Sequence, residues 1–600
     1  MTKKMHAWQL AALPLAISLA SFSGTANAVD FRLGDVRGQL DSQLSVGMSV
    51  STTSADKRFI HVDTFRNGKD MRGQAAARTS DDKRMNYDKG DIFSKVFRGS
   101  HDLALTYNNS GAFFRGKYWY DFEQKDGSQR FYDINDSGRK PLEKASGVYL
   151  LDAFVYHNYF IGNNPGNIRL GRQVVSWGES TFIGNSINSI NPIDVAAFRR
   201  PGAEVKEGLI PVEMIYLNQG LTSDLSMEAF YQLRWAPSVL DNCGTFFGAD
   251  TLATGCIDRL VFGGMDLPQG DPGLGVFPPN IVVRARKNDE PKDSGQFGVA
   301  FRYFATAIDT EFGLYAMNYH SRTPNYNTVQ GVHTAIPIGA PTNPPGLGGL
   351  NGGAGYFFDY PEDIRLYGVS FQTNIGGTAV SGEFSYRPNM PLGITTGSMT
   401  VAGLTGNGGV IGRNTTTYTL GDEIQGYDRK EMYQAQVTAI HFVERVLGAS
   451  RLSLVGEVGV NYLAGLSHSD GSTFYGRDSL FGGSPTLDGS CYSEDTGRGA
   501  SWCEKDGFFS STSWGYRGVA TLDYSNVFRG VNLSPRLAWS HDVKGWGPNF
   551  SEDAKSVSLG VRADYANKYS ADLSYTTFFD GKYNTNVDRD FAAVSVSVTF

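Results

Sequence analysis

The chain ends on the stretch FAAVSVSVTF (591–600), in which two kinds of side chain alternate up to the last residue. Val594, Val596, Val598 and Phe600 fall on one parity, and small polar side chains fall on the other. Successive side chains of a β-strand point to opposite faces, so this strand has one apolar face and one polar face. An unpaired terminus usually frays, whereas this pattern predicts a strand that is held to its very end.

The opposite end of the chain has the layout of a secretory signal peptide. Lys3 and Lys4 precede an apolar run, which closes on the A-x-A cleavage pattern at 26–28. The apolar run is shorter than the roughly 20 residues that a membrane-spanning helix needs. We therefore expect residues 1–28 to be removed on export and residues 29–600 to fold as a single domain outside the cytoplasm.

Composition favours a β-barrel in a membrane. Aromatic residues make up 13% of the 600 residues, beside 72 Gly, yet no long apolar run follows the signal peptide. Transmembrane β-barrels have this composition because their apolar residues alternate with polar ones and aromatic residues gather at the two membrane interfaces. A secreted β-sandwich or β-helix is the alternative. The net charge of -7 and the lack of a basic stripe argue against a nucleic-acid partner.

Similar alternation recurs along the whole chain, and its polar face carries charge of both signs. In one such run Phe114 and Tyr118 alternate with Arg115 and Lys117. Mixed charge on one face is typical of a barrel with a water-filled lumen. The residues that we predict to line this lumen are Arg115, Lys117, Asp121, Glu123, Arg172, Glu228, Arg234, Arg302, Glu383, Glu457, Arg517, Asp523, Arg562 and Asp564.

Connection lengths predict the topology. Short links are expected at 108–111, 162–166, 219–223, 306–309, 376–377, 525–530 and 566–568. Long polar links are expected at 53–100, 125–146, 174–211, 236–294, 321–362, 388–428, 467–513, 541–556 and 580–589. Short periplasmic turns that interleave with long outer loops are the signature of an outer-membrane barrel. We predict an all-β, antiparallel transmembrane barrel of about 18 strands, with 16 as the alternative, in which 591–600 pairs with the first strand.

The third long link, residues 174–211, differs from the other loops because it is both apolar and charged. Its apolar residues present more surface than a loop leaves in water. We expect this loop to fold into the lumen and to constrict it, as the third outer loop of porins does. The residues predicted to form the constriction are Trp177, Glu179, Asp194, Arg199, Arg200 and Glu204. The alternative is a loop that caps the mouth of the barrel or packs on a neighbouring subunit.

The four cysteines all lie in proposed outer loops. Cys243 and Cys256 share one loop, and Cys491 and Cys503 share another. Close, even pairs in an exported chain are typical of disulfides, so we predict two loop disulfides, although crossed pairing stays open. Neither spacing is Cys-x-x-Cys and no histidine cluster accompanies them, so we predict no metal site.

The sequence offers no catalytic motif. It contains no HExxH, GxSxG or EF-hand pattern, and the glycine-rich stretch at 344–355 is preceded by no strand, as a phosphate-binding loop would require. We therefore expect neither enzymatic activity nor a cofactor.

Several stretches resemble a known family. GDIFSKVFRGSHDLALTY (90–107), GRQVVSWGES (171–180), SINPID (189–194) and RRPGAE (199–204) look like a proteobacterial outer-membrane family of porin-like β-barrel proteins, catalogued as a domain of unknown function. Members are often encoded near lipid-transport-like envelope proteins and large inner-membrane exporters. The resemblance implies envelope transport, with a hydrophobic compound as one candidate solute and with a periplasmic lipid-transport-like protein and an inner-membrane exporter as partners.

Two functions follow. The first is an outer-membrane channel that passes or exports a small molecule, hydrophobic or anionic in character. The second is a surface or envelope-assembly protein that uses the barrel as an anchor and acts through its long loops. In both cases we expect contact with outer-membrane lipid and lipopolysaccharide, and recognition of Phe600 by the barrel-assembly machinery.

Overall fold

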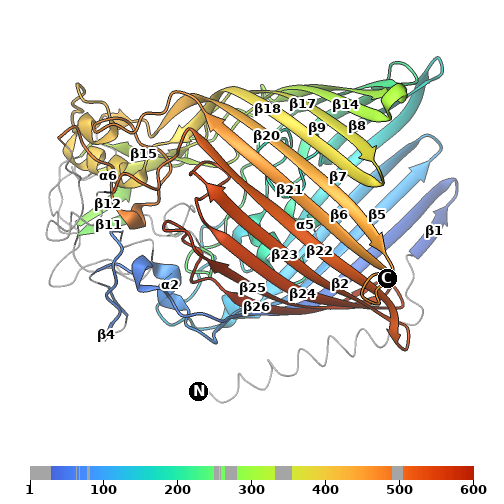
Figure 1. The fold of residues 1–600 in the computed structure, drawn as a ribbon, viewed down its shortest axis with the longest axis horizontal. Helices are drawn as coiled ribbons and strands as arrows, with labels where there is room; N and C mark the ends of the chain where they lie inside the picture. Colours follow the sequence, from blue (N-terminus) through green and yellow to red (C-terminus); the bar gives the residue numbers. More distant parts are fainter. Residues whose placement is uncertain are drawn as a thin grey trace.

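The computed structural model describes residues 29–62, 64–66, 68–77, 81–203, 205–248, 256, 259–263, 280–331, 354–488 and 504–600 (Figure 1). Strands dominate this part of the chain. None of its helices has the length and the apolar character needed to cross a bilayer.

Eighteen antiparallel strands form a closed ring, in agreement with the predicted fold class. In order around the ring they are β2 (Val36–Ser51), β5 (Ile92–Tyr107), β6 (Ser110–Asp121), β7 (Ser146–Ile161), β8 (Asn164–Gln173), β9 (Val212–Gly220), β10 (Leu225–Gln232), β13 (Phe297–Ala305), β14 (Thr310–Tyr319), β17 (Ile364–Ile375), β18 (Thr378–Gly393), β20 (Tyr427–Glu444), β21 (Arg451–Leu463), β22 (Thr512–Phe528), β23 (Val531–Lys544), β24 (Lys555–Tyr565), β25 (Tyr569–Phe579) and β26 (Phe591–Thr599). Each strand pairs with the next along the chain, and β26 pairs with β2 to close the ring.

The closing seam holds the last residue of the chain. Phe600 donates its backbone N–H to the carbonyl of Ser42 at 2.8 Å, and Ser42 donates back to Phe600. Beyond this point the same edge of β2 is covered by β1 (Val29–Leu33), whose Val29 lies opposite Leu40. The stretch 591–600 is therefore the closing strand, as its alternation predicted, and β1 continues the pairing where β26 ends.

The two ends of the barrel differ in their connections. Short turns lie at 108–109, 162–163, 221–224, 306–309, 376–377, 445–450, 529–530 and 566–568. In Figure 1 the C-terminus and β1 lie at the right, and most of the labelled elements of the long loops, among them α2, α6 and β11, lie at the left. The turn at 445–450 was missed because its sequence, RVLGAS, carries two apolar residues; three of its residues, Arg445, Leu447 and Gly448, take positive φ.

The outer face of the barrel is apolar. Leu559 on β24 and Leu573 on β25 are more than half exposed, as lipid-facing side chains are. Four tyrosines stand directly opposite one another on β17, β18, β20 and β21 with neighbouring rings 4.7–6.5 Å apart. They are Tyr367, Tyr386, Tyr433 and Tyr462. A row of this kind near the long-loop end is the aromatic girdle of a membrane barrel.

Above the barrel, the long loops form a second sheet that the sequence analysis did not anticipate. Its strands are β11 (Arg259–Gly263), β12 (Asn280–Arg284), β15 (Asn325–Val329), β16 (Gly355–Asp359) and β19 (Glu423–Ile424). Helix α6 (Thr396–Thr405) packs against β15, and Met399 of α6 is fully buried in one apolar cluster with Tyr356 and Phe358 of β16.

Smaller elements complete the loops. They are β3 (Phe65–Arg66), β4 (Lys69–Asp70), α2 (Asp82–Asn86) and α3 (Phe122–Asp126). A disulfide joins Cys243 to Cys256, as predicted. The predicted partners Cys491 and Cys503, and the signal peptide, lie outside the described residues.

Candidate functional site

Residues 174–211 connect β8 to β9 over the boundaries that the sequence predicted. The segment contains two short helices, α4 (Val195–Arg199) and α5 (Val205–Gly208), with Asp194 capping the first by accepting the N–H of Ala197 at 2.9 Å. The side chains of the barrel strands that hold it, such as Glu457, Glu383 and Lys117, lie on the polar parity of their strands, which places the segment inside the ring.

The first part of the segment packs an apolar core against one side of the lumen. Trp177 is fully buried, with its ring 5.1 Å from Phe230 on β10 and 5.9 Å from Tyr315 on β14. Its indole N–H donates to Glu228 at 2.7 Å, so the polar atom of the ring is satisfied. Ile187 and Ile190 extend this core. The lumen beside β9, β10, β13, β14 and β17 is therefore filled.

Two carboxylates on the barrel wall hold the backbone of this segment. Glu457 on β21 accepts the N–H groups of Thr181, Phe182 and Ile183 at 3.0, 2.6 and 2.7 Å. Glu383 on β18 accepts those of Glu179 and Ile187. Hydrogen bonds to an ionised acceptor are about twice as strong as neutral ones. The pair thus fixes the segment against β18 and β21.

Two buried arginines hold carbonyl groups of the same segment. Arg387 on β18 donates to the carbonyl of Ser186 at 2.8 Å and to the Tyr319 hydroxyl at 2.9 Å. Arg322 donates to the carbonyl of Ile190 at 3.1 Å. Together with the carboxylates, they secure donors and acceptors of the segment that would otherwise be buried without partners.

The second part of the segment is fixed to the opposite side of the lumen. Lys117 on β6 pairs with Asp194 at 3.0 Å, and Arg98 on β5 pairs with Glu207 at 2.6 Å. Pro201 approaches Gly47 on β2 so closely that a Cβ there would stand 2.8 Å from its ring. The segment thus spans the lumen from β18 and β21 to β2, β5 and β6.

Many of the predicted lumen residues are consequently covered. Lys117, Glu383 and Glu457, which hydrogen-bond to the segment, are at most 5% exposed. Asp121 is 2% exposed for another reason, because it caps α3 and accepts from the Ser94 hydroxyl. Alternation gave the face on which these side chains lie, but it could not show that a loop occupies that space. Arg302 lies in the same filled region, where it pairs with Glu228, Glu311 and Glu179 at 3.2, 2.9 and 3.6 Å. Arg115 faces inward and pairs with Asp102 at 2.8 Å and Asp152 at 3.3 Å.

Three predicted positions differ from their expected placement. Glu123 lies in α3 beyond the end of β6 and pairs with Lys95 at 2.6 Å. Arg234 lies beyond the end of β10, with 73% of its side chain exposed. Arg172 lies within β8 on the parity of the exposed Leu170, not on the lumen parity, and donates to the Tyr149 hydroxyl at 2.7 Å. For Glu123 and Arg234, alternation persists past the last hydrogen bond of the strand, so the sequence pattern extended beyond the ends of β6 and β10.

The arginines of the segment have partners of their own. Arg199 forms an ion pair with Asp241 in the next long loop and stacks on Phe247. Arg200 lies 4.7 Å above the ring of Trp119 and makes no ion pair within the described residues. The predicted constriction residue Glu204 is outside the described part of the chain.

The inner faces of β22 to β25 are the part of the wall that the segment leaves open. Within the described residues, none of its hydrogen bonds or ion pairs reaches these strands. Their inward side chains form a ladder of Arg–Asp pairs with serines and threonines between them. The pairs are Arg517–Asp542 at 2.5 Å, Arg536–Asp572 at 3.0 Å, Arg562–Asp564 at 3.0 Å and, together with β21, Arg451–Asp523 at 2.9 Å. Arg536, Asp542, Asp572 and Arg451 were not predicted, although each shares the inward parity of its strand.

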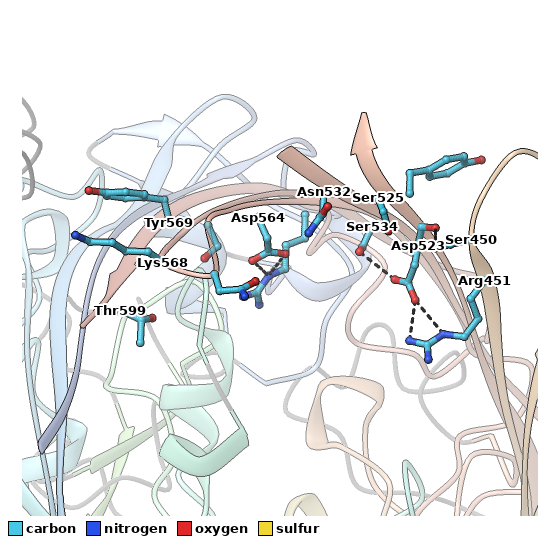
Figure 2. A pocket seen from close by; sticks show the side chains of 14 residues that line it. Ser450, Arg451, Asp523, Ser525, Asn532, Ser534, Asp564, Lys568, Tyr569 and Thr599 are labelled. Carbon is cyan, nitrogen blue, oxygen red and sulfur yellow. Dashed lines mark hydrogen bonds and ion pairs between the residues drawn. The ribbon is translucent and has the colours of Figure 1, made fainter. Parts of the chain in front are cut away.

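At the short-turn end of this open wall lies a polar cavity of about 670 Å³. Figure 2 shows Arg451 reaching toward Asp523, and Ser534 pointing at the same carboxylate. Asp564, Asn532 and Lys568 line the cavity farther along. Among the described residues, no group of three or more metal-ligating side chains occurs here or elsewhere.

A closed antiparallel ring with an apolar, aromatic-girdled outer face and a polar inner face defines a porin-like, membrane-spanning β-barrel. Over residues 9–600 the sequence matches the family described as a protein of unknown function (DUF1302), and the chain belongs to that family.

Solved structures with a similar arrangement are those of bacterial outer-membrane proteins. OccAB1 of Acinetobacter baumannii is 9% identical, with 96% of this chain and 99% of that chain covered and a TM-score of 0.40. The outer membrane channel DcaP of A. baumannii is 9% identical, with coverages of 95% and 99% and a TM-score of 0.34. The outer membrane protein OpdK of Pseudomonas aeruginosa is 9% identical, with coverages of 94% and 98% and a TM-score of 0.38. No curated protein sequence matches the chain.

Proposed function

We propose that the protein is a channel of the bacterial outer membrane that passes small polar solutes. The observation that carries this proposal is the division of the lumen: residues 174–211 fill one side, and the inner faces of β22 to β25 stay free and polar. A loop fixed in this way narrows the passage without closing it, and the free wall offers hydrogen bonds along its length.

The polar wall favours a polar solute over the hydrophobic compound that the family resemblance implies. A hydrophobic molecule would gain nothing from the Arg–Asp pairs and would displace water that hydrates them. Trp177 and Ile187 are fully buried in their own core and offer no surface to a passing solute, whereas Phe182 and Phe198 of the same segment are 40% and 42% exposed.

Single-channel recording in a planar lipid bilayer tests the proposal. The purified, heat-modifiable barrel should give stepwise conductance in potassium chloride. A preparation that is folded by that criterion and yet gives no conductance would rule out a channel. An unfolded sample from the same purification is recorded in parallel, as the control for conductance from contaminating porins.

Location and partners are part of the proposal. The apolar outer face supports contact with outer-membrane lipid, and the long loops would face lipopolysaccharide. The barrel-assembly machinery, a periplasmic lipid-transport-like protein and an inner-membrane exporter are the proposed protein partners. Cross-linking in intact cells from the short-turn end, for example from a photoreactive residue at Asn567, would test the two envelope proteins.

The second candidate is a surface protein that acts through its loops, and one observation favours it. The outer loops build a sheet with its own buried core, including Tyr356, Phe358 and Met399. The mouth of a channel does not require a loop sheet with a buried core of its own. Deletion of the loop sheet separates the two candidates, because a channel should still conduct whereas a surface function would be lost.

A further inference from the structure

The open side of the lumen carries nearly equal numbers of positive and negative groups: four Arg–Asp pairs and one further cation, Lys568, at the cavity. On β21 to β25 each arginine that faces the passage is matched by an aspartate within 2.5–3.0 Å. Glu457 is the additional acid on this wall, but it is 2% exposed and bound by the loop backbone, so it does not face the passage. The passage wall is therefore dense in charge and close to neutral.

The pairs are interlaced rather than isolated. Arg562 lies directly opposite Asp572 in the strand register but pairs with Asp564 on its own strand. Asp572 on β25 instead forms an ion pair with Arg536 on β23, which lies on the other side of β24. Arg562 thus has a second carboxylate close by, and positive and negative groups alternate across β23 to β25.

The charged side chains remain accessible in spite of their pairing. Arg451 and Arg562 have about half of their side chains exposed, at 53% and 49%. Both line the 670 Å³ cavity, together with Asp523 and Asp564. A cavity of this volume is within the range that holds small ligands. The neighbouring strand β26 adds small uncharged groups to this side of the lumen, such as Ser597 and Ala593.

We propose that this cavity and the ladder above it recognise small zwitterionic solutes, which carry an ammonium and a carboxylate on the same molecule. This inference rests on the proposed channel function. An ion of either sign meets attraction from one member of a pair and repulsion from the other. A zwitterion lies antiparallel to the pair, so that its ammonium meets Asp523 or Asp564 and its carboxylate meets Arg451 or Arg562. Fixed charges act strongly in such a passage because its walls are of low dielectric.

Four solutes of nearly equal size test the inference. L-alanine is a zwitterion, L-lactate an anion, L-alaninamide a cation and lactamide a neutral molecule at pH 7. Tracer efflux from proteoliposomes is measured with equal, low concentrations of potassium chloride on both sides, which holds the membrane potential near zero without screening the fixed charges. We expect alanine to leave faster than lactate and alaninamide by about threefold or more, and faster than lactamide.

Variants of one pair sharpen the test. Asp523→Asn leaves Arg451 without its partner and should move the preference toward lactate. Arg451→Gln leaves Asp523 alone and should move the preference toward alaninamide. Asp70→Asn, in the exposed ion pair with Arg72 on the β3–β4 hairpin, is the matched control and should leave all four rates unchanged.

The possible outcomes separate the two proposals. Efflux of lactate or alaninamide above that of alanine in the parent protein overturns the zwitterion assignment and leaves the channel in place. Equal efflux of all four solutes also overturns the zwitterion assignment and leaves the channel in place, because it shows selection by size alone. Absence of efflux for every solute from liposomes that contain folded barrel overturns the channel itself, and the inference with it.

Discussion

Glu457 on β21 accepts a hydrogen bond from the backbone N–H of Ile183 at 2.7 Å, although 274 residues separate them in the chain. The same carboxylate holds the N–H groups of Thr181 and Phe182. One side chain of the barrel wall thereby fixes a turn of the loop that fills the lumen. We therefore expect the size of the passage to depend on this attachment.

Glu457→Gln should loosen the loop. The amide side chain is neutral and turns its NH₂ group toward donors, so about 1–3 kcal/mol of stabilisation should be lost at this contact. Single-channel conductance should become larger and noisier, with the barrel still folded. Glu290→Gln, which removes an exposed carboxylate in an outer loop, should change neither property. Unchanged conductance and noise in the Glu457 variant would contradict the attachment.

The orientation of β24 can be tested with two neighbouring residues. Leu559 faces lipid and is 53% exposed, whereas Ser558 faces the lumen and accepts a hydrogen bond from Thr576. Arginine on the lipid face costs about 2–4 kcal/mol near the midplane of the bilayer, and lumen positions tolerate it. Refolding into lipid vesicles, followed by gel shift, should show Leu559→Arg strongly impaired and Ser558→Arg mildly affected. Equal yields would mean that the faces are assigned wrongly.

Phe600 has two separable roles in the seam. Its backbone pairs with Ser42, and its aromatic ring is the proposed signal for the assembly machinery. Phe600→Asp keeps the backbone pairing, so it should reduce outer-membrane levels in cells but refold normally from denaturant in vitro. Deletion of Phe600 should impair both. If Phe600→Asp accumulates in cells like the parent, the ring is not an assembly signal.

An ion pair between distant loops predicts a pH dependence. Arg84 on α2 donates to Asp588 in the last long loop at 2.9 Å, and both side chains are buried. Burial acts to raise the pKa of the Asp588 carboxyl, but Arg589 and Arg84 outweigh burial and hold this pKa below its ordinary value. A carboxyl with a lowered folded-state pKa stabilises the fold above its unfolded pKa, and this stabilisation is lost as pH falls through the folded value.

The outer loops of the parent should therefore resist protease at pH 7 and lose this protection only below about pH 4, near and below the ordinary pKa of aspartate. Asp588→Asn should be cleaved readily at pH 7, because Arg84 then stays buried without its counter-charge. Limited proteolysis across a pH series provides the measurement. Equal protection of variant and parent at pH 7 would show that this pair does not hold the loops.

The sequence predicted the barrel well because its strongest signal is local. Alternation in stretches such as 591–600 follows directly from the geometry of a strand, and the long link 174–211 was placed to the residue. Its apolar composition indicated burial, and the contacts of Trp177 and Ile187 show where those side chains lie.

The partners of individual charges could not be predicted in the same way. Glu457 and Arg517 stand opposite each other on neighbouring strands, and parity alone treats them alike. Glu457 accepts hydrogen bonds from the backbone of the loop, so Arg517 pairs with Asp542 instead. The partner of each of these two charged side chains thus depends on the loop 174–211, which lies hundreds of residues away in the chain. The loop sheet escaped prediction for a similar reason, because its strands are short and come from separate loops.

Accessibility of a single cysteine tests the central claim most directly, namely that solutes pass along β22 to β25. Ser558→Cys places a thiol on the open wall, and Ser385→Cys places one on β18 beneath the loop, where Ser385 is fully buried against Ser186. A negatively charged methanethiosulfonate reagent is added during single-channel recording, with the parent protein as the control for its native cysteines. We predict that the reagent lowers the conductance of Ser558→Cys and leaves that of Ser385→Cys unchanged. A block of Ser385→Cys without any effect on Ser558→Cys would contradict this account of the lumen.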